Sequence, residues 1–271
     1  MLTRVHHVGL VVRRLEDGLA LWQDTLGLRV AKQAVIRDQG VKAALLPIGR
    51  SEIELLEPVD PDGGVAKFLE KRGEGLHHVC FETPDVAAEL ASAKAKELPL
   101  IDQAPRAGLA GMICFLHPKG TRGVLVEFAT PPAADHHPAT AGTGPLAELA
   151  LAEVTARSRD AASAATLFAT AFGLDRATAG VERGATAAAV TAGGVRLRFV
   201  SADSASAGPE AAALRAAVEA GGEGLAALVL EVRDVDAAAG ALAALAPARD
   251  GDTLRLAADR CHGVPLAVRR S

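Results

Sequence analysis

The stretch VHHVGLVV at residues 5–12 decides the fold, because it returns as LHHVCFE at residues 76–82. Both copies are rich in residues that favour β-strands, and both carry a pair of histidines near the start. A segment of helical period, acidic and rich in Leu and Ala, follows each copy at residues 15–26 and 86–97. The repetition predicts two related units, each of which begins with a strand and then a helix.

Further strand-like runs complete each unit, ending in EIELL at 52–56 and GVLVEF at 123–128, which predicts two β-α-β-β-β units. The pattern then starts again: residues 162–173 echo the first helical segment, and GEGL at 73–76 recurs at 222–225. Short strands that alternate with single helices predict an α+β fold with mixed sheets. The predicted organisation is a first domain at 1–131, a Pro- and Gly-rich linker at 132–145 and a second domain at 146–271.

Composition excludes several functional classes. The chain has 271 residues, of which 49% are hydrophobic and 23% charged, and its formal net charge is -4, so we expect a globular protein that does not bind nucleic acid. The apolar stretches fall well short of the roughly 20 residues that span a bilayer, and no secretory leader is recognisable. The 3 scattered cysteines fit reduced thiols, so we expect a cytoplasmic protein without a membrane partner.

The strands that open and close each unit share a pattern of alternating side chains. Because side chains alternate across a strand, each of these strands has two faces, and one of them is bulky and apolar in all four. The opposite face carries a His in each opening strand and a Glu in each closing strand: His7, Glu54, His78 and Glu127. The two histidines are 71 positions apart and the two glutamates 73, so they occupy matching places in the two units.

Two imidazoles and two carboxylates form a donor set that suits a divalent ion such as Co, Ni, Zn or Mn. Carboxylates buried side by side without a cation would lose hydration and repel each other, which also favours a bound ion. A lone His at the start of a strand is more often a hydrogen-bonded core or edge residue than a ligand, and we interpret His6 and His77 as packing or hydrogen-bonding residues. Glu52 and Glu57 are interpreted as surface charges or hydrogen-bond partners.

The segments around these residues resemble the vicinal oxygen chelate superfamily, and within it the methylmalonyl-CoA epimerases. The matching segments cover nearly the whole first domain: HHVGLVV (6–12), QGVK (39–42), EIELLEP (52–58), AKFLEKRGEGLHH (66–78), LID (100–102), FLHPK (115–119) and GVLVE (123–127). The strand motifs are typical of the superfamily, whereas FLHPK and KFLEK point more narrowly at the epimerases. The resemblance implies two tandem domains whose paired units form a curled mixed sheet, the first around a divalent metal.

The resemblance also implies an isomerase that interconverts the (R) and (S) forms of methylmalonyl-CoA or of a similar 2-substituted acyl-CoA. The C2 proton lies between a thioester and a carboxylate, and a divalent ion would stabilise the enolate that forms when this proton leaves. Glu127 matches a family position that is both a ligand and a candidate acid/base. Cationic side chains are expected near the CoA phosphates, and the candidates are Lys71, Arg72, Lys119 and Arg122.

The chain departs from part of the family at residue 43. Some members carry a glutamate on the strand after the QGV segment, whereas this chain has Ala43. A two-sided epimerisation needs a second proton-transfer group on the opposite face of the planar intermediate. Asp38, Gln39 or a water would have to serve that face, or the substrate differs.

The second domain lacks the ligand set. Aligning the repeats places Glu153, Arg198, Ala227 and Ala267 where the first domain has its four candidate ligands, so no metal is expected in residues 146–271. Single-domain relatives typically pair two copies. The second domain is therefore expected to take the place of a partner subunit, which makes the chain an intrachain pseudo-dimer and is compatible with a monomer.

Three alternative functions stay open. A glyoxalase I-like lactoylglutathione lyase is expected to use the same His-Glu-His-Glu set, and it also moves a proton beside a metal-bound carbonyl. A ring-cleaving dioxygenase of the superfamily uses two His and one Glu, usually in the C-terminal domain, whereas here the intact set is N-terminal. A drug-binding resistance protein needs no metal. The FLHPK and KFLEK segments favour the CoA ester over these alternatives.

Overall fold

The computed structural model describes residues 1–133, 144–177, 179–182, 184–202 and 208–271. The helices are α1 (Leu15–Leu19), α2 (Gly64–Arg72), α3 (Val86–Ala95), α4 (Ala161–Phe172), α5 (Pro209–Gly221) and α6 (Val235–Ala241), with a π-helical turn η1 (Ala20–Thr25) after α1. Short 3-10 turns are η2 (Arg37–Gln39), η3 (Pro118–Gly120), η5 (Gly144–Leu146), η6 (Ala243–Leu245) and η7 (Ala258–Arg260). None of the helices in the described part of the chain combines the length and the apolar character that crossing a membrane requires.

The described strands form two mixed sheets, which confirms the predicted α+β class. The first sheet holds β1 (Arg4–Val11), β2 (Lys32–Ile36), β3 (Val41–Ile48), β4 (Ser51–Pro58), β5 (Gly75–Glu82), β6 (Arg106–Gly108), β7 (Gly111–Leu116) and β8 (Leu125–Thr130). The second holds β9 (Ala150–Arg157), β10 (Asp175–Arg176), β11 (Gly180–Glu182), β12 (Ala185–Ala192), β13 (Val195–Ser201), β14 (Gly224–Val232), β15 (Ala248–Asp250), β16 (Thr253–Leu256) and β17 (Leu266–Arg270).

The strand pairing repeats four times along the described chain. In each repeat the opening strand pairs in parallel with the closing strand: β1 with β4, β5 with β8, β9 with β13, and β14 with β17. The closing strand pairs antiparallel with the strand before it in all four cases. A helix follows each opening strand, because a parallel return within one sheet needs a crossover. We number these β-α-β-β-β units repeats 1 to 4, and they confirm the predicted repetition.

The described residues gather into two compact units, and each unit draws on both halves of the sequence. The repeat 2–3 unit comprises Met1–Val5, His78–Pro131 and Glu153–Ala226. The repeat 1–4 unit comprises His6–His77, Pro132–Ala152 and Ala227–Ser271. Residues 134–143 of the predicted linker lie outside the described residues, and the domain boundaries at 131 and 146 stay a prediction.

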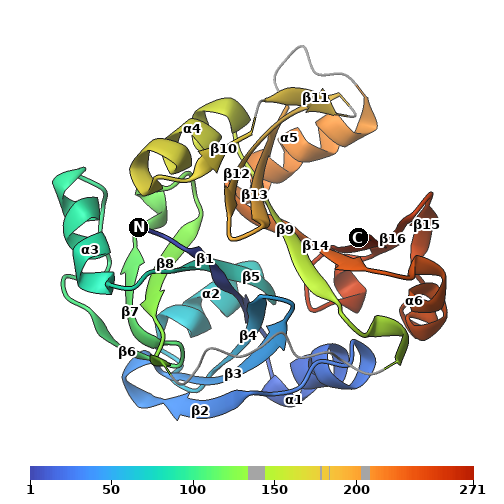
Figure 1. Cartoon of the computed structure of the whole chain (residues 1–271), viewed down its shortest axis with the longest axis horizontal. Coiled ribbons are helices and arrows are strands. Elements are labelled where there is room, and N and C mark those ends of the chain that lie inside the picture. Colours follow the sequence, from blue (N-terminus) through green and yellow to red (C-terminus); the bar gives the residue numbers. More distant parts are fainter. Residues whose placement is uncertain (134–143, 178, 183, 203–207) are drawn as a thin grey trace. The chain divides into compact units, whose positions relative to one another are not determined.

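An aromatic cluster forms the core of the repeat 2–3 unit. Phe172 of α4 packs against Phe81 of β5 and Phe128 of β8, with ring centroids 6.3 and 5.7 Å apart. Phe168, one turn earlier on α4, lies 4.9 Å from the ring of Phe199 on β13. Helix α3 lies beside β7 and β8 (Figure 1). The apolar face predicted for the strands of repeat 2 is therefore the face that α4 covers.

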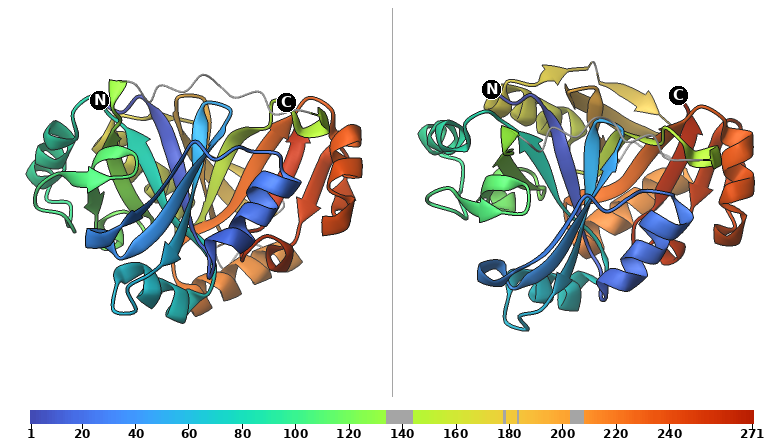
Figure 2. Two further views of the ribbon diagram at one scale, coloured as in Figure 1. Left: turned by 90° about the horizontal axis from the view of Figure 1, so that it is seen from below. Right: turned by 60° about the horizontal axis from the view of Figure 1, so that its bottom comes forward.

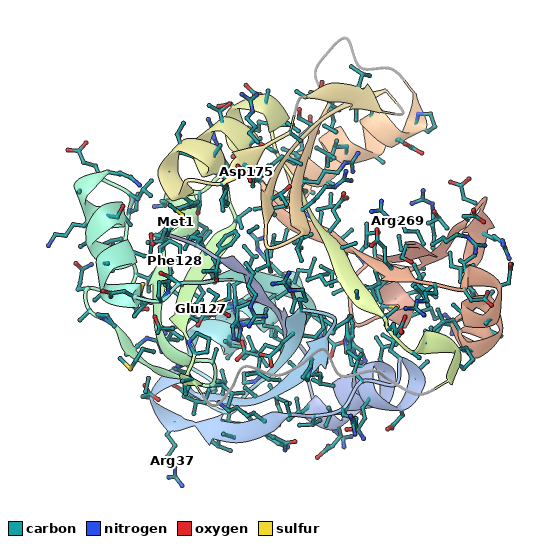
Figure 3. The ribbon with its side chains drawn as sticks, in the orientation of Figure 1. Met1, Arg37, Glu127, Phe128, Asp175 and Arg269 are labelled. Carbon is teal, nitrogen blue, oxygen red and sulfur yellow. The ribbon has the colours of Figure 1, made fainter. Side chains whose placement is uncertain are left out.

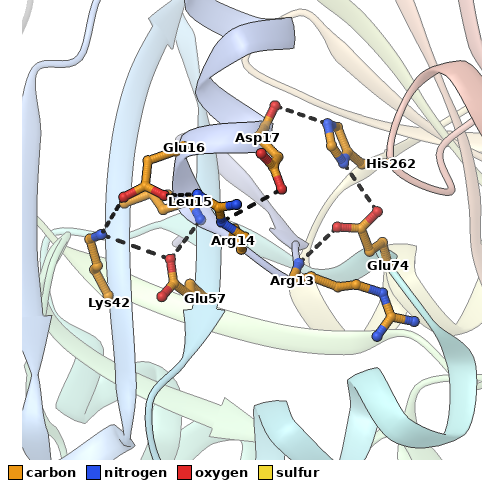
Figure 4. A network of polar contacts seen from close by, with 9 residues as sticks. All are labelled: Arg13, Arg14, Leu15, Glu16, Asp17, Lys42, Glu57, Glu74 and His262. Atoms are coloured by element: carbon orange, nitrogen blue, oxygen red, sulfur yellow. Dashed lines mark hydrogen bonds and ion pairs between the residues drawn. The ribbon is translucent and has the colours of Figure 1, made fainter.

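A polar network joins repeat 1 to repeat 4 in the other unit (Figure 4). The side chain of Glu74 accepts a hydrogen bond from the backbone N–H of Arg13 at 2.7 Å, and its other oxygen lies 3.1 Å from Nδ1 of His262. Nε2 of His262 lies 3.0 Å from the carbonyl oxygen of Asp17. The side chain of Glu57 accepts a hydrogen bond at 2.6 Å from the backbone N–H of Leu15, the first residue of α1. The prediction that Glu57 is a hydrogen-bond partner is therefore confirmed. In the same unit, α6 packs on β16 and β17 (Figure 2).

Two glycines mark equivalent close contacts in the two units. Gly263 and Gly123 both have φ near +77°, a left-handed conformation that favours glycine. A Cβ on Gly263 would lie 2.0 Å from the carbonyl oxygen of Glu74, and one on Gly123 would lie 2.2 Å from that of Glu223. The turn before the closing strand thus meets the turn before an opening strand in the same way in both units.

The three cysteines are expected to be unreactive in the folded protein. Cys80, Cys114 and Cys261 are all buried, and burial raises the pKa of the Cys114 thiol to about 12 and that of the Cys261 thiol to about 11. Since the thiolate is the reactive form, Ellman's reagent at pH 8 should label no thiol in the native chain and all three after unfolding. Rapid labelling of the native chain would contradict this burial.

Candidate metal centre

Repeat 1 presents a buried His–Glu pair. His7 on β1 lies opposite Glu52 of β4, and Glu54 lies opposite Gly9, so His7 and Glu54 are diagonal neighbours on one face of the sheet. Nε2 of His7 is 3.5 Å from Oε2 of Glu54. The two residues are only 0% and 6% exposed, so both functional groups are withdrawn from solvent.

Repeat 2 presents the same pair in the same register. His78 on β5 lies opposite Leu125 of β8, and Glu127 lies opposite Cys80, which reproduces the diagonal of repeat 1. Nε2 of His78 is 3.0 Å from Oε2 of Glu127, and the residues are 1% and 3% exposed. Glu127 and Phe128, both labelled in Figure 3, follow each other on β8 and so point to opposite faces of the sheet, and Phe128 enters the aromatic cluster.

The chemistry of both pairs fits a divalent ion. Two ligand atoms that each lie about 2.1 Å from a shared ion, in octahedral or tetrahedral geometry, are roughly 3.0–3.4 Å apart. The nitrogen–oxygen distances of 3.5 and 3.0 Å are close to this range. Imidazole nitrogen and carboxylate oxygen are also ligands that Zn, Co, Ni and Mn accept. Each pair therefore has the donor types and the spacing of half a metal site.

A second histidine supports His7 from behind. Nδ1 of His6 is 2.9 Å from Nδ1 of His7, and the same atom of His6 is 3.7 Å from Oε2 of Glu52. His6 and Glu52 are both buried, at 3% and 6% exposed, so the surface alternative for Glu52 is wrong. With Nε2 of His7 turned toward Glu54, a proton on its Nδ1 can be donated to His6. Ligand histidines are commonly oriented by such a hydrogen bond at the other ring nitrogen.

Phe115 borders the pair of repeat 2. It lies directly opposite Glu127 in the pairing of β7 with β8, and its ring meets the His78 ring edge to face, with centroids 5.3 Å apart. The neighbouring His77 packs on Phe68 in the same manner at 5.0 Å, which confirms its interpretation as a packing residue.

Arg106 and Asp102 belong to the surroundings of this pair, and the sequence analysis missed both. Nε of Arg106 donates to Oδ1 of Asp102 at 3.0 Å, and the guanidinium carbon lies 5.6 Å from the centre of the Phe115 ring. Asp102 was within the matched LID segment, and an Arg four residues later was the available signal. The sequence could not place them, because β6 is only three residues long and its alternation is too short to read.

The cationic candidates for CoA phosphates lie in both units. Lys71 and Arg72 end α2 in the repeat 1–4 unit, where the Arg72 guanidinium carbon lies 6.0 Å from the centre of the Phe68 ring. Lys119 lies in η3 of the repeat 2–3 unit, and Arg122 donates from Nη2 to Oγ of Ser163 at 2.7 Å. Arg122 thus takes part in the packing of repeat 2 on repeat 3. A role of these four in phosphate binding stays a prediction.

Ala43 lies on the Glu54 side of repeat 1. It pairs with Leu56, while Leu45, two residues further on, pairs with Glu54. Ala43 is fully buried, so a carboxylate at this position would face the same side as Glu54. The methyl group of Ala43 cannot act as a general acid or base.

Repeat 3 has the guanidinium group of Arg198 where repeat 1 has the carboxylate of Glu54. Arg198 lies opposite Thr155, two residues beyond the pair formed by Glu153 and Arg196, which reproduces the diagonal of His7 and Glu54. The buried carboxylate of Glu153 accepts a hydrogen bond from Nε of Arg196 at 3.0 Å, and Nη1 of Arg198 lies 3.9 Å from it. In repeat 4, Ala267 lies opposite Val229, at the place of Glu127.

Comparisons with known proteins identify the family of the chain. The glyoxalase/bleomycin resistance protein/dioxygenase superfamily matches residues 6–116. An ethylmalonyl-CoA/methylmalonyl-CoA epimerase of Cereibacter sphaeroides is 36% identical over 133 residues, which cover 47% of this chain and 98% of that protein. The human mitochondrial methylmalonyl-CoA epimerase is 34% identical over 129 residues, which cover 47% of this chain and 73% of that protein.

The whole chain also has a structural counterpart. A triple mutant of 4-hydroxymandelate synthase from Streptomyces coelicolor superposes with a TM-score of 0.73, covering 99% of this chain and 92% of that one. Its sequence identity is 16%, so this likeness concerns the fold alone. The chain belongs to the glyoxalase/bleomycin resistance protein/dioxygenase superfamily, and its first half is homologous to methylmalonyl-CoA epimerases.

Proposed function

We propose that the chain is a metal-dependent epimerase of methylmalonyl-CoA or of a similar 2-substituted acyl-CoA. The proposed metal ligands are His7, Glu54, His78 and Glu127. The observation that carries the proposal is the buried His–Glu diagonal, which repeats 1 and 2 present in the same register and with the same chemistry. The homologous epimerases support the substrate class, since this chain matches 98% of the length of one of them.

Glu127 is the proposed group that moves the proton. Its Oε2 lies 3.0 Å from Nε2 of His78, and its carboxylate is the proposed group that accepts the C2 proton and returns it. A divalent ion of the Co, Ni, Zn or Mn type, when bound, would supply Lewis-acid stabilisation of the enolate formed at C2.

The second face of the enolate needs another proton source. Ala43 has none, so Asp38, Gln39 or a water is the proposed donor on that side. The alanine at position 43 also leaves a second candidate function open. A glyoxalase I-like lyase is expected to use the same four ligand types, and it moves a proton beside the carbonyl of a different substrate.

Proton exchange at C2 separates the two functions. The full chain loaded with Co²⁺ is incubated with (2S)-methylmalonyl-CoA in deuterated water, and the C2 proton is followed by NMR. We expect the C2 signal to disappear and the (2R) form to accumulate, while the metal-free chain leaves the substrate unchanged. Unchanged methylmalonyl-CoA together with turnover of a glutathione hemithioacetal would replace the epimerase proposal by the lyase.

A further inference from the structure

Arg106 keeps one buried nitrogen, Nη1, whose N–H donors have no partner in the described part of the chain. Its side chain is 31% exposed, but the Nη1 atom is buried and makes no hydrogen bond there. Asp102 accepts only from Nε, although a guanidinium carries five N–H donors. A buried donor without an acceptor is costly, so such a group marks a place where a ligand atom would be stabilised.

Two contacts fix where this guanidinium lies. Asp102 accepts from Arg106 with one oxygen and from the backbone N–H of Phe115 with the other, at 2.8 Å. The guanidinium then rests near the Phe115 ring, an arrangement that orients its plane. Both contacts tie Arg106 to the residue that borders His78 and pairs with Glu127.

The strand register places Arg106 on the side of the proposed ligands. Arg106 pairs with Ile113 of β7, and Phe115, two residues later, pairs with Glu127 of β8. Residues two apart on a strand share a face, so Arg106, Phe115 and Glu127 all belong to one face of the repeat 2 sheet. The charged group is therefore built into the face where the proposed reaction takes place.

We infer that Arg106 binds the free carboxylate of the acyl-CoA substrate and so selects malonyl-type esters over simple acyl esters. This inference rests on the proposed function. A guanidinium and a carboxylate match as planar groups with parallel donors and acceptors. Of the groups on C2 of the proposed substrate, only the carboxylate is a planar anion that matches the guanidinium. Arg106 thus holds that end of the substrate and does not itself take the C2 proton.

Binding of two matched esters tests the inference. Methylmalonyl-CoA and isobutyryl-CoA differ only in that a methyl group replaces the carboxylate. Their dissociation constants are measured by calorimetry with the Co²⁺-loaded full chain, for the wild type, R106Q, R106K and a control, R176Q, which alters an exposed arginine of the same unit. Melting temperatures of all variants verify that they are folded.

We expect R106Q to raise the dissociation constant of methylmalonyl-CoA about 10–100-fold, the range for loss of a charge-assisted hydrogen bond. The dissociation constant of isobutyryl-CoA should stay within about twofold of the wild-type value. The affinity of R106K for methylmalonyl-CoA should lie between those of R106Q and the wild type, since lysine keeps the positive charge but lacks the two parallel N–H donors of a guanidinium. R176Q should match the wild type. An equal loss for both esters would show that Arg106 only supports the sheet, and no loss for methylmalonyl-CoA would equally overturn the inference.

Free methylmalonate keeps this test separate from the test of the proposed function. Binding of the diacid that depends on Arg106 would support carboxylate recognition even if the chain epimerises no CoA ester. The converse outcome is that the wild type epimerises the ester while R106Q binds the carboxylate as well as the wild type does. That result would support the proposed function and would contradict the role inferred for Arg106. Failure of the wild type to bind either methylmalonyl-CoA or methylmalonate would overturn the inference outright.

Discussion

Replacing Glu127 by Gln is expected to lower the kcat of epimerisation by about 10³-fold or more. General acid–base catalysis by a positioned side chain contributes about 10²–10⁴-fold, and an amide is a weaker metal ligand than a carboxylate. The substitution keeps the volume of the side chain beside His78, so packing is preserved. The measurement is the rate of C2 proton exchange in deuterated water at saturating Co²⁺.

A matched substitution checks that the loss belongs to the site. Glu219→Gln changes an exposed carboxylate on α5 of the same compact unit and should leave the exchange rate unchanged. If Glu127→Gln retained more than a tenth of the activity, another group would be moving the proton. A melting temperature close to that of the wild type would show that the loss is chemical.

Replacing His78 by Ala is expected to reduce the affinity for Co²⁺ by more than the roughly 10–100-fold that follows loss of an outer partner of a metal ligand. The imidazole nitrogen that faces Glu127 at 3.0 Å would be gone, and the buried carboxylate would lose its neighbour. Metal content after purification and calorimetric titration with Co²⁺ measure the effect. Thermal unfolding gives a second readout, since a ligand at 100 times its Kd stabilises the folded state by about 2.7 kcal/mol.

The adjacent histidine is the control for this prediction. His77→Ala removes an imidazole that packs on Phe68, so it should affect stability more than metal content. Undiminished Co²⁺ binding by His78→Ala would exclude His78 from the site. A loss of metal in both variants would indicate a folding defect, and the melting temperature without metal would reveal it.

Much of the fold was predictable because strand alternation and repetition are local properties of the sequence. The apolar face that includes Phe81 and Phe128 was correctly predicted from a period of two, and the structure packs that face on α4. Repetition also placed each His and Glu at equivalent positions, and the strand register confirms that equivalence.

Other features depend on contacts between distant residues, whose positions local sequence patterns do not report. Arg106 lies near the proposed site only because β6 pairs with β7, which brings its guanidinium beside Phe115. The hydrogen bond between His6 and His7 joins side chains that alternation would place on opposite faces. The aromatic cluster joins residues on β5 and α4 that are 91 positions apart, and sequence periodicity does not report which strand a helix will cover.

The mixed composition of the compact units bears on how such a chain could arise by gene duplication. Residues 78–131 find their aromatic neighbours, Phe168 and Phe172, in the other half of the polypeptide, and Glu74 finds His262 there. If either half were produced alone, the surfaces through which these residues contact the other half would be exposed to water. A duplicated copy that lost its proposed ligand residues would still be needed to cover these surfaces, so packing alone gives a reason for a chain to retain it.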